Sequence, residues 1–255
     1  MASKPTIVIV PGAWQLTTGY APFADLLRQS GFDTKCVTMP STGGTQLPLT
    51  GLAEDIAAVR AVIQSLVDAG KEVVLLVHSA GGVSGSGGVR GLDVKTRKKA
   101  GLSGGVTRVI YMAAFMLPKG TCLLDMVGGE PLPWMVLQNA DMGVKGDRVT
   151  IDPESMSDVG LGYLPPEEQK RWGKELSHTS AILFEGVSEY EPWNEGIPCA
   201  YIFAEDDGAI HYPVQQKMAA QLGPNALTAT LKSSHCPFLS MQKELLEAVE
   251  KIVAA

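Results

Sequence analysis

At 255 residues, with 45% hydrophobic and 19% charged residues, the chain is long enough to bury one sizeable core and too apolar to be disordered throughout. A formal net charge of −6, with no basic run beyond residues 95–99, argues against a nucleic-acid partner. No apolar stretch is long enough to cross a bilayer and the N-terminus lacks a secretory signal, so we expect a cytoplasmic protein without a membrane partner.

Strand and helix patterns alternate in the first third of the chain. Apolar, β-branched runs predict strands at residues 6–10, 34–39 and 73–77, and helical spacing predicts helices at residues 23–30 and 52–69. Alternation of this kind is typical of an α/β fold, with a mostly parallel central sheet and helices on both faces.

The strand at residues 73–77 leads directly into His78-Ser79-Ala80-Gly81-Gly82. Such a sequence is typical of a nucleophile elbow, where a serine lies on a strained turn between a buried strand and a helix. Ser79 is therefore the candidate nucleophile, and an ordinary strand-to-helix turn is the alternative. Small residues are expected two positions before and after such a serine; Gly81 fits this rule and Val77 departs from it.

The next part of the chain is rich in glycine. We expect a glycine-rich helix through Gly91, then a loop up to Gly105, and a strand at residues 106–113. The basic run at residues 95–99 is interpreted as a solvated helix end or loop.

Residues 118–198 contain no clear sheet strand, and short helical patterns such as residues 166–176 break off quickly. We expect a small helical cap, inserted before the penultimate strand of a core formed by residues 1–117 and 199–255. An insertion there would lie above the nucleophile and select the substrate. Its Met and Trp residues suit a bulky hydrophobic or aromatic ligand, or fill gaps within the cap: Met126, Trp134, Met135, Met142, Met156, Trp172 and Trp193.

Two further strand patterns, at residues 199–204 and 226–231, are each followed by ionisable side chains, and helices are expected at residues 213–222 and 243–253. A serine nucleophile needs a base to take its proton and an acid to orient that base. His235, shortly after the second strand, is the candidate base. Three acids follow the first strand, and spacing alone separates two of them poorly; we prefer Asp207 to Asp206 and Glu205.

An oxyanion hole requires two converging backbone amides. The amide of Ala80 follows the nucleophile, and that of Ala13 lies in the loop where Pro11-Gly12 ends the first strand. Six side chains next to these elements in sequence are candidates for an apolar substrate pocket, or else belong to the core: Trp14, His78, Phe115, Met116, Trp134 and Phe238.

Neither the cysteines nor the histidines have the spacing of a metal site. Cys36, Cys122, Cys199 and Cys236 contain no C-x-x-C pair, which suits reduced thiols. We therefore expect no metal and no cofactor. The expected partner is a small-molecule substrate, and a homodimer is left open.

Five segments together resemble the α/β-hydrolase superfamily over almost the whole chain. They are VIVPGAW, VHSAGG, GGVTRVIYMAAFMLPKG, IPCAYIFAEDDGAI and SSHCPFLS. They are similar in particular to the compact group of plant methyl esterases, hydroxynitrile lyases and fungal hydrolases. The resemblance implies a catalytic role for the aspartate three residues before Ile210, which is Asp207, and it implies that His235 is the base and Ala13 an oxyanion residue.

Two departures narrow the expected chemistry. Pro11 replaces the usual histidine of the first motif, and Cys236 stands where hydroxynitrile lyases of the group carry a lysine, so cyanohydrin cleavage is disfavoured. The resemblance implies hydrolysis of a carboxylic ester or lactone through an acyl-enzyme. The alternatives are a carbon-carbon lyase or cyclase acting on a natural product, with His235 as base, and a noncatalytic binding protein.

Overall fold

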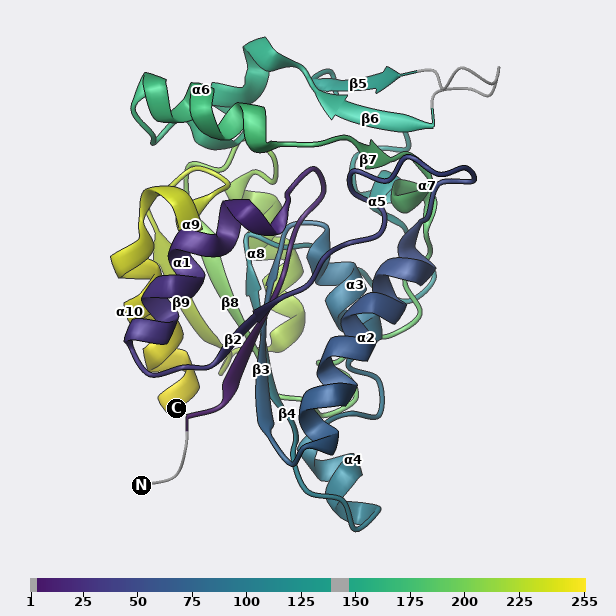
Figure 1. The fold of residues 1–255 in the computed structure, drawn as a ribbon, viewed down its shortest axis with the longest axis vertical. Coiled ribbons are helices and arrows are strands. Elements are labelled where there is room, and N and C mark those ends of the chain that lie inside the picture. Colours follow the sequence, from purple (N-terminus) through teal and green to yellow (C-terminus); the bar gives the residue numbers. More distant parts are fainter. Residues whose placement is uncertain (1–3, 139–146) are drawn as a thin grey trace.

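The computed structural model describes residues 4–138 and 147–255, and its centre is a six-stranded sheet (Figure 1). The strand order is β2-β1-β3-β4-β8-β9, and every neighbouring pair is parallel. The parallel α/β sheet expected from the alternating patterns is thereby confirmed. Its strands are β1 (Thr6–Val10), β2 (Thr34–Cys36), β3 (Glu72–His78), β4 (Gly105–Met112), β8 (Cys199–Ala204) and β9 (Leu227–Leu231).

Helices cover both faces of this sheet, because successive strand residues point to opposite sides. Ile7 and Ile9 of β1 pack in one core cluster with α1 (Thr17–Gln29) and α10 (Gln242–Ala254). Val8 and Val10 pack in the other with α2 (Leu52–Asp68) and α8 (Tyr212–Ala219). The remaining helices of the core are α3 (Gly81–Gly88), α4 (Val94–Lys99), α9 (Pro237–Ser240) and the 3-10 turn η3 (Ala220–Leu222).

The segment between β4 and β8 contains a second sheet, which corrects the expectation of no strand there. Its order is β5-β6-β7, with antiparallel pairing. β5 and β6 are short and mostly exposed or half-exposed, and β7 is a buried pair of polar residues, so none of the three has the buried apolar run that marks the inner strands of the central sheet. The segment lies across one end of the central sheet (Figure 1). Its elements are α5 (Leu123–Met126), β5 (Met135–Gln138), β6 (Arg148–Ile151), η1 (Pro153–Ser155), η2 (Ser157–Leu161), α6 (Pro166–Glu175), β7 (Thr179–Ser180) and α7 (Ile182–Glu185).

The prediction of only a loop between Gly91 and Gly105 is wrong. Helix α4 forms there because the Asp93 carboxylate caps it, accepting from the Thr96 amide at 2.8 Å. Arg97, in the middle of the basic run, is buried and forms an ion pair with Asp68 at 3.0 Å. Arg97 is therefore a buried structural residue, while the lysines at the end of the basic run face solvent.

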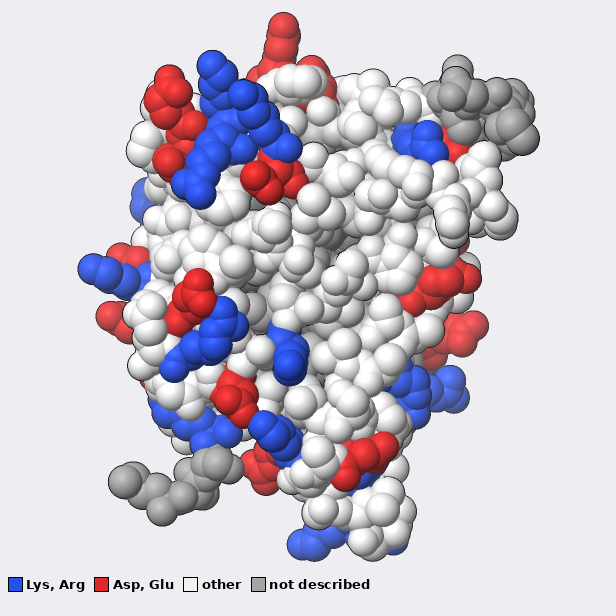
Figure 2. All heavy atoms as spheres, in the orientation of Figure 1, with Lys and Arg blue, Asp and Glu red and all other residues white. Residues whose placement is uncertain are grey.

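Charged side chains of both signs are interspersed on the molecular face seen in Figure 2. Helix α1 begins six residues earlier than expected, because it continues N-terminally through Pro22, which interrupts the sequence pattern. Within the described residues, none of the helices has the length and hydropathy that a bilayer crossing requires.

Candidate active site

Ser79 lies at the sharp turn between β3 and α3, with a φ of 53° that is unusual for a residue with a side chain. The turn is tightly packed. A Cβ atom at Gly12 would come within 2.7 Å of the Ser79 Cβ, and one at Gly81 within 2.3 Å of the Pro11 carbonyl oxygen. These glycines are therefore required for the approach of the β1 loop to the elbow, and the strained turn is what an exposed nucleophile needs.

Val77 departs from the small-residue rule without a clash because the helix after the elbow leaves room for it. A Cβ atom at Gly85 would lie 2.4 Å from Val77 Cγ1, so the space for the valine methyl group is supplied by the missing side chain of Gly85. Glycine at this position of α3 and valine in β3 are thus complementary in volume.

His235 and Asp207 form a buried hydrogen-bonded pair. The distance from His235 Nδ1 to Asp207 Oδ2 is 2.8 Å, and the Asp207 side chain is fully buried. The other carboxylate oxygen, Oδ1, accepts from the amides of Ala209 and Ile210, both at 2.8 Å. Because Nδ1 of neutral His235 donates to the carboxylate, its Nε2 is the nitrogen left free to accept a proton.

The two neighbouring acids take other partners. The side chains of Glu205 and Asp206 are 44% and 41% exposed and lie 3.9 and 3.6 Å from the Lys232 ammonium group. Asp206 also accepts a hydrogen bond from the hydroxyl of Tyr163. Of the three candidate acids, Asp207 is the one that contacts His235.

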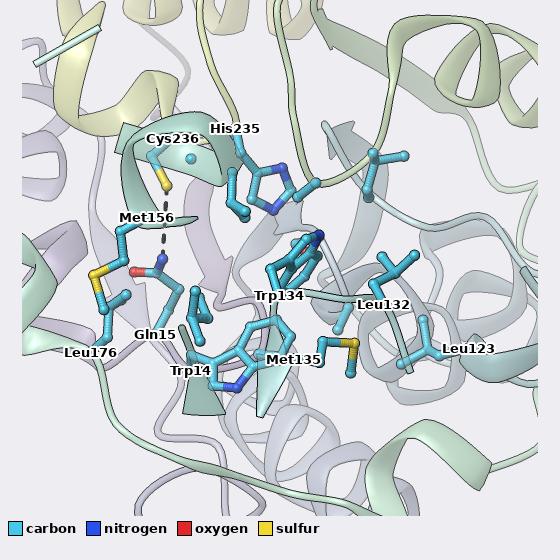
Figure 3. Close-up of a pocket in the computed structure, with 18 of the residues that line it drawn as sticks. Trp14, Gln15, Leu123, Leu132, Trp134, Met135, Met156, Leu176, His235 and Cys236 are labelled. Atoms are coloured by element: carbon cyan, nitrogen blue, oxygen red, sulfur yellow. Dashed lines mark hydrogen bonds between the residues drawn. The ribbon is translucent and has the colours of Figure 1, made fainter. Parts of the chain in front are cut away.

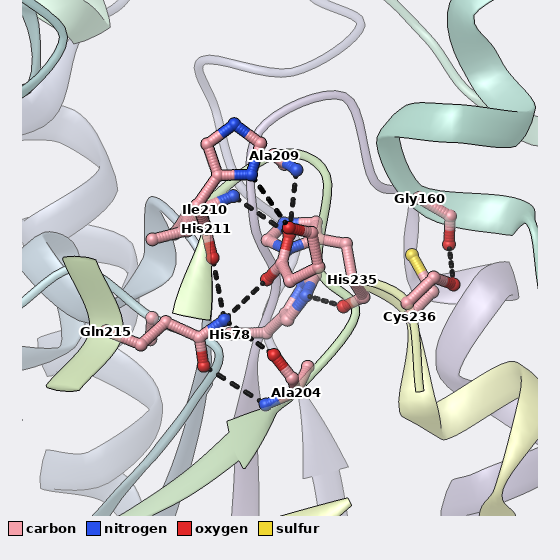
Figure 4. Close-up of polar contacts among 12 residues, drawn as sticks. His78, Gly160, Ala204, Ala209, Ile210, His211, Gln215, His235 and Cys236 are labelled. Atoms are coloured by element: carbon pink, nitrogen blue, oxygen red, sulfur yellow. Dashed lines mark hydrogen bonds and ion pairs between the residues drawn. The ribbon is translucent and has the colours of Figure 1, made fainter. Parts of the chain in front are cut away.

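Gln215 is a polar residue of this site that sequence reasoning missed. It is fully buried on α8, and its Nε2 donates to Asp207 Oδ2 at 3.1 Å and to the Ile210 carbonyl at 2.7 Å (Figure 4). Its Oε1 accepts from the Ala204 amide at the end of β8, at 3.0 Å. Gln215 therefore ties the carboxylate to the sheet. The one available signal in the sequence was a polar residue at this position of an otherwise ordinary helical pattern.

Ala13 and Ala80, the two candidate oxyanion residues, border the same cavity as Ser79. In the part of the chain that the structure describes, neither amide donates a hydrogen bond to the protein. The amides beside Ala13 are both engaged: that of Gly12 donates to the Tyr20 hydroxyl at 3.2 Å, and that of Trp14 to Thr179 Oγ1 at 2.6 Å. The Ala13 and Ala80 amides are thus available to a ligand oxygen.

His78 was expected to line the substrate pocket, but it is fully buried behind the elbow. Its Nε2 faces the His235 carbonyl oxygen at 2.9 Å, which can only accept, so Nε2 carries the proton. Its Nδ1 therefore accepts from the Tyr20 hydroxyl at 2.7 Å. Burial, together with the nearby His235, holds the pKa of His78 well below its usual value. Neutral His78 thus links the β1 loop, through Tyr20, to the backbone of His235.

Two other expected pocket residues also belong to the core. Met116 and Phe238 are fully buried and do not border the cavity. Phe238 stacks on Tyr20 with ring centroids 4.1 Å apart, and the Met116 side chain packs in the cluster on the α2 face of the sheet. Adjacency in sequence to a site residue could not distinguish lining from core because neighbouring residues in a turn point in different directions.

Trp14, Phe115 and Trp134 do line the cavity that contains Ser79 and His235 (Figure 3). Trp14 and Trp134 meet edge to face, with ring centroids 5.5 Å apart. The cavity volume is about 60 Å³, and the lining is predominantly apolar. The other apolar side chains around it include Leu123, Leu132, Met135, Ile151, Met156, Leu176 and Phe184.

An outer pocket of about 570 Å³ adjoins this inner cavity, and the two share lining residues that include Phe115, Leu132 and Trp134. His211 and Asp158 add polar groups to the outer pocket. A bulky ligand could thus occupy both spaces, with its reacting group at Ser79.

Some methionines and tryptophans of the inserted segment line the two pockets, and others pack against the core. Met135, Met156 and Trp134 line the inner cavity and Met126 the outer pocket. Trp172 and Trp193 pack against the two core clusters, and Met142 lies outside the described residues. Within the described ranges, no group of three or more His, Cys, Asp or Glu side chains is arranged to hold a metal ion.

The sequence model of the "Alpha/beta hydrolase family" matches residues 7–248. The chain is 28% identical over 237 residues to "Alpha/beta hydrolase nvfD" of Aspergillus novofumigatus, covering 93% of this chain and 92% of that protein. It is 26% identical over 255 residues to a "Pyrethroid hydrolase" of Sphingobium wenxiniae, covering 95% and 85%. A methylesterase structure from Arabidopsis superposes with a TM-score of 0.78 at 19% identity, covering 98% of this chain and 99% of that one.

Proposed function

The chain belongs to the alpha/beta hydrolase family, and on this basis we propose that it is a serine hydrolase that cleaves a carboxylic ester or lactone of a small, hydrophobic substrate. The observation that supports this best is the convergence on one cavity of Ser79, the His235–Asp207 pair, and Ala13 and Ala80, whose amides donate to no protein group within the described residues. These are the groups that acyl transfer requires: a nucleophile, an oriented base and donors for an oxyanion.

In the proposed mechanism, Ser79 Oγ attacks the substrate carbonyl while His235 Nε2 takes the hydroxyl proton. Asp207 keeps His235 in the required tautomer and stabilises the imidazolium. The amides of Ala13 and Ala80 bind the oxyanion of the tetrahedral intermediate. His235 then gives its proton to the leaving alcohol, and a water molecule, activated in the same way, releases the acid and regenerates Ser79. No cofactor takes part in these steps.

The inserted segment, residues 118–198, is proposed to act as the cap that selects the substrate. It contributes most of the apolar side chains of the inner cavity, among them Trp134, Met135 and Leu176. The likeness to curated relatives named as hydrolases, including the pyrethroid hydrolase, favours hydrolysis over the lyase or cyclase alternative.

Hydrolysis of p-nitrophenyl acetate, butyrate and octanoate by the wild type, Ser79→Ala and His235→Ala tests this proposal, with fluorophosphonate labelling as a second readout. We expect wild-type activity that both variants lose, and labelling that requires Ser79. Ser84→Ala is the matched control, because this buried serine lies on α3 and its hydroxyl has no partner within the described residues. Activity that survives in Ser79→Ala would instead support a reaction in which His235 acts alone as base.

A further inference from the structure

Gln15 is a polar side chain on an otherwise apolar section of the cavity wall. It follows Trp14 in the loop after β1, is 9% exposed, and borders the inner cavity. Several other polar side-chain groups along the cavity already have a role. Ser79 and His235 serve the proposed chemistry, and the indole N–H of Trp14 donates to the Val149 carbonyl at 2.8 Å.

The carboxamide of Gln15 is poorly satisfied by the protein. Within the described residues its one hydrogen bond runs from Nε2 to Cys236 Sγ at 3.7 Å, and sulfur is a weak acceptor. A primary amide offers two donors and two acceptor sites, so its capacity is mostly unused whichever way the group is turned. A ligand with a matching polar group would use this free hydrogen-bonding capacity.

The cavity has two sides, and His235 lies between them (Figure 3). Trp134, Met135 and Leu123 lie on one side, which is apolar and partly aromatic. Gln15 and Cys236 lie on the other, beside the apolar side chains of Met156 and Leu176. A substrate whose scissile carbonyl sits at Ser79 would therefore extend one arm towards the aromatic side and the other towards the carboxamide.

The charge of the cavity restricts which polar group fits there. No lysine or arginine lines the inner cavity among the described residues, so a carboxylate or phosphate at Gln15 would be buried without a counter-ion. The nearby Cys236 offers no thiolate to a cationic group, because burial raises the pKa of its thiol. An uncharged hydroxyl or carbonyl is the group that a carboxamide can bind here.

We propose that Gln15 is a specificity-determining residue that hydrogen-bonds an uncharged hydroxyl or carbonyl on the substrate arm opposite the aromatic side. This inference rests on the proposed ester hydrolysis for its choice of substrate class. It narrows that class to esters with one bulky apolar arm and one short arm that carries a hydrogen-bonding group.

Binding of matched esters in a Ser79→Ala background tests Gln15 without turnover. The first pair is 2-hydroxyethyl phenylacetate and ethyl phenylacetate, which differ by one hydroxyl on the arm opposite the phenyl ring. The second is 2-hydroxyethyl 3-phenylpropanoate and ethyl 3-phenylpropanoate. We expect calorimetry to show a preference of about tenfold or more for the hydroxylated member of at least one pair, because a site built to hydrogen-bond rejects analogues that lack the group. Adding Gln15→Met should reduce that preference below about threefold, with the plain ester bound as before.

Several results would overturn the inference. An equal loss of affinity for both members of a pair would indicate a purely structural role of Gln15. A preference that persists in Gln15→Met, or no binding of any of the four esters, would exclude the proposed contact. Cys236→Ala should keep the preference; if it abolished the preference while Gln15→Met did not, the thiol would be the recognition group.

Turnover by the Ser79-containing protein separates this inference from the proposed function. If the binding preference depends on Gln15 and the wild type hydrolyses none of the esters, the contact stands and ester hydrolysis fails. If the wild type hydrolyses the esters through Ser79 without any effect of Gln15→Met on the ratio of kcat/KM values within a pair, hydrolysis stands and the contact fails.

Discussion

Replacing Asp207 with asparagine tests the proposed triad sharply, because the surroundings of the carboxylate dictate how the new side chain must lie. Oδ1 accepts from two backbone amides, those of Ala209 and Ile210. An asparagine NH2 group at that place would leave both buried donors unpaired, at about 1–3 kcal/mol each. The amide oxygen of Asp207→Asn must therefore take the Oδ1 position.

The NH2 group of the asparagine is then forced towards His235 Nδ1 and Gln215 Nε2, which both approach Oδ2 in the wild type. His235 Nδ1 can no longer donate and must accept, so the imidazole proton moves to Nε2. That is the nitrogen that should receive the Ser79 proton. Loss of the correct tautomer and of the negative charge should lower kcat by a factor on the order of 10⁴, or about 5.5 kcal/mol in the activation free energy.

Steady-state hydrolysis of p-nitrophenyl butyrate at neutral pH measures this effect, and thermal unfolding checks that the variant is folded. Asp206→Asn is the matched control, because the neighbouring carboxylate is exposed and contacts Tyr163 and Lys232 rather than His235. Its activity should stay within about twofold of wild type, as an exposed pair contributes little. A folded Asp207→Asn variant within tenfold of the wild-type kcat would refute the assignment of Asp207 as the orienting acid.

Three further predictions concern the groups behind the cavity. Tyr20→Phe leaves the Gly12 amide and His78 Nδ1 without their hydrogen-bond partner, and it should lower the free energy of unfolding, measured by denaturant titration, by about 2–4 kcal/mol. An unchanged free energy of unfolding would contradict the hydrogen bonds from Gly12 through Tyr20 to His78. Burial raises the pKa of Asp55 from its ordinary 3.8 to about 6, so the folded state binds the carboxyl proton more tightly than the unfolded state does. The free energy of unfolding of the wild type should therefore fall by about 2–3 kcal/mol between pH 4 and 7, relative to that of Asp55→Asn. Stability curves for the two proteins that run parallel over this range would contradict the raised pKa. Thr179→Val removes the acceptor of the Trp14 amide and should lower kcat roughly tenfold with little change in KM. Thr179→Ser keeps the hydroxyl and should retain activity. Equal kcat values for the two variants would exclude a positioning role of Thr179.

The sequence was sufficient for most of the central sheet because its four inner strands, β1, β3, β4 and β8, are short, mostly buried and mainly apolar runs, whereas the edge strands β2 and β9 are largely exposed or half-exposed. It was insufficient where structure depends on contacts between distant residues. The strands at Met135–Gln138 and Arg148–Ile151 pair with each other across a surface segment and lack a buried run, so no local pattern marks them. The helix at Val94–Lys99 depends on a cap and on Arg97 reaching the carbonyl of Val67 in α2, which composition alone does not reveal.

The candidate site divides in the same way. Ser79 and His235 could be found because strand ends and turn residues leave a sequence signal, and both border the cavity. The contact of Asp207 with His235, by contrast, depends on which of three consecutive acids turns inwards, and spacing alone separated two of them poorly. His78 was misplaced for the same reason: it is the last residue of the strand that precedes Ser79, and its side chain points behind the elbow rather than into the cavity.

Trp14 gives a physical reason to expect that the inserted segment and the proposed oxyanion amide of Ala13 act together. Its amide donates to Thr179 Oγ1, its carbonyl accepts from the Ser177 amide at 2.9 Å, and its indole donates to the Val149 carbonyl. All three partners belong to the inserted segment, whereas the Ala13 amide is one residue away. A φ of 65° at Trp14 is held by these contacts. Any displacement of that segment must therefore either break buried hydrogen bonds or turn the peptide group next to Ala13, so a ligand that fills the cavity against Trp14 would also fix the proposed oxyanion donor.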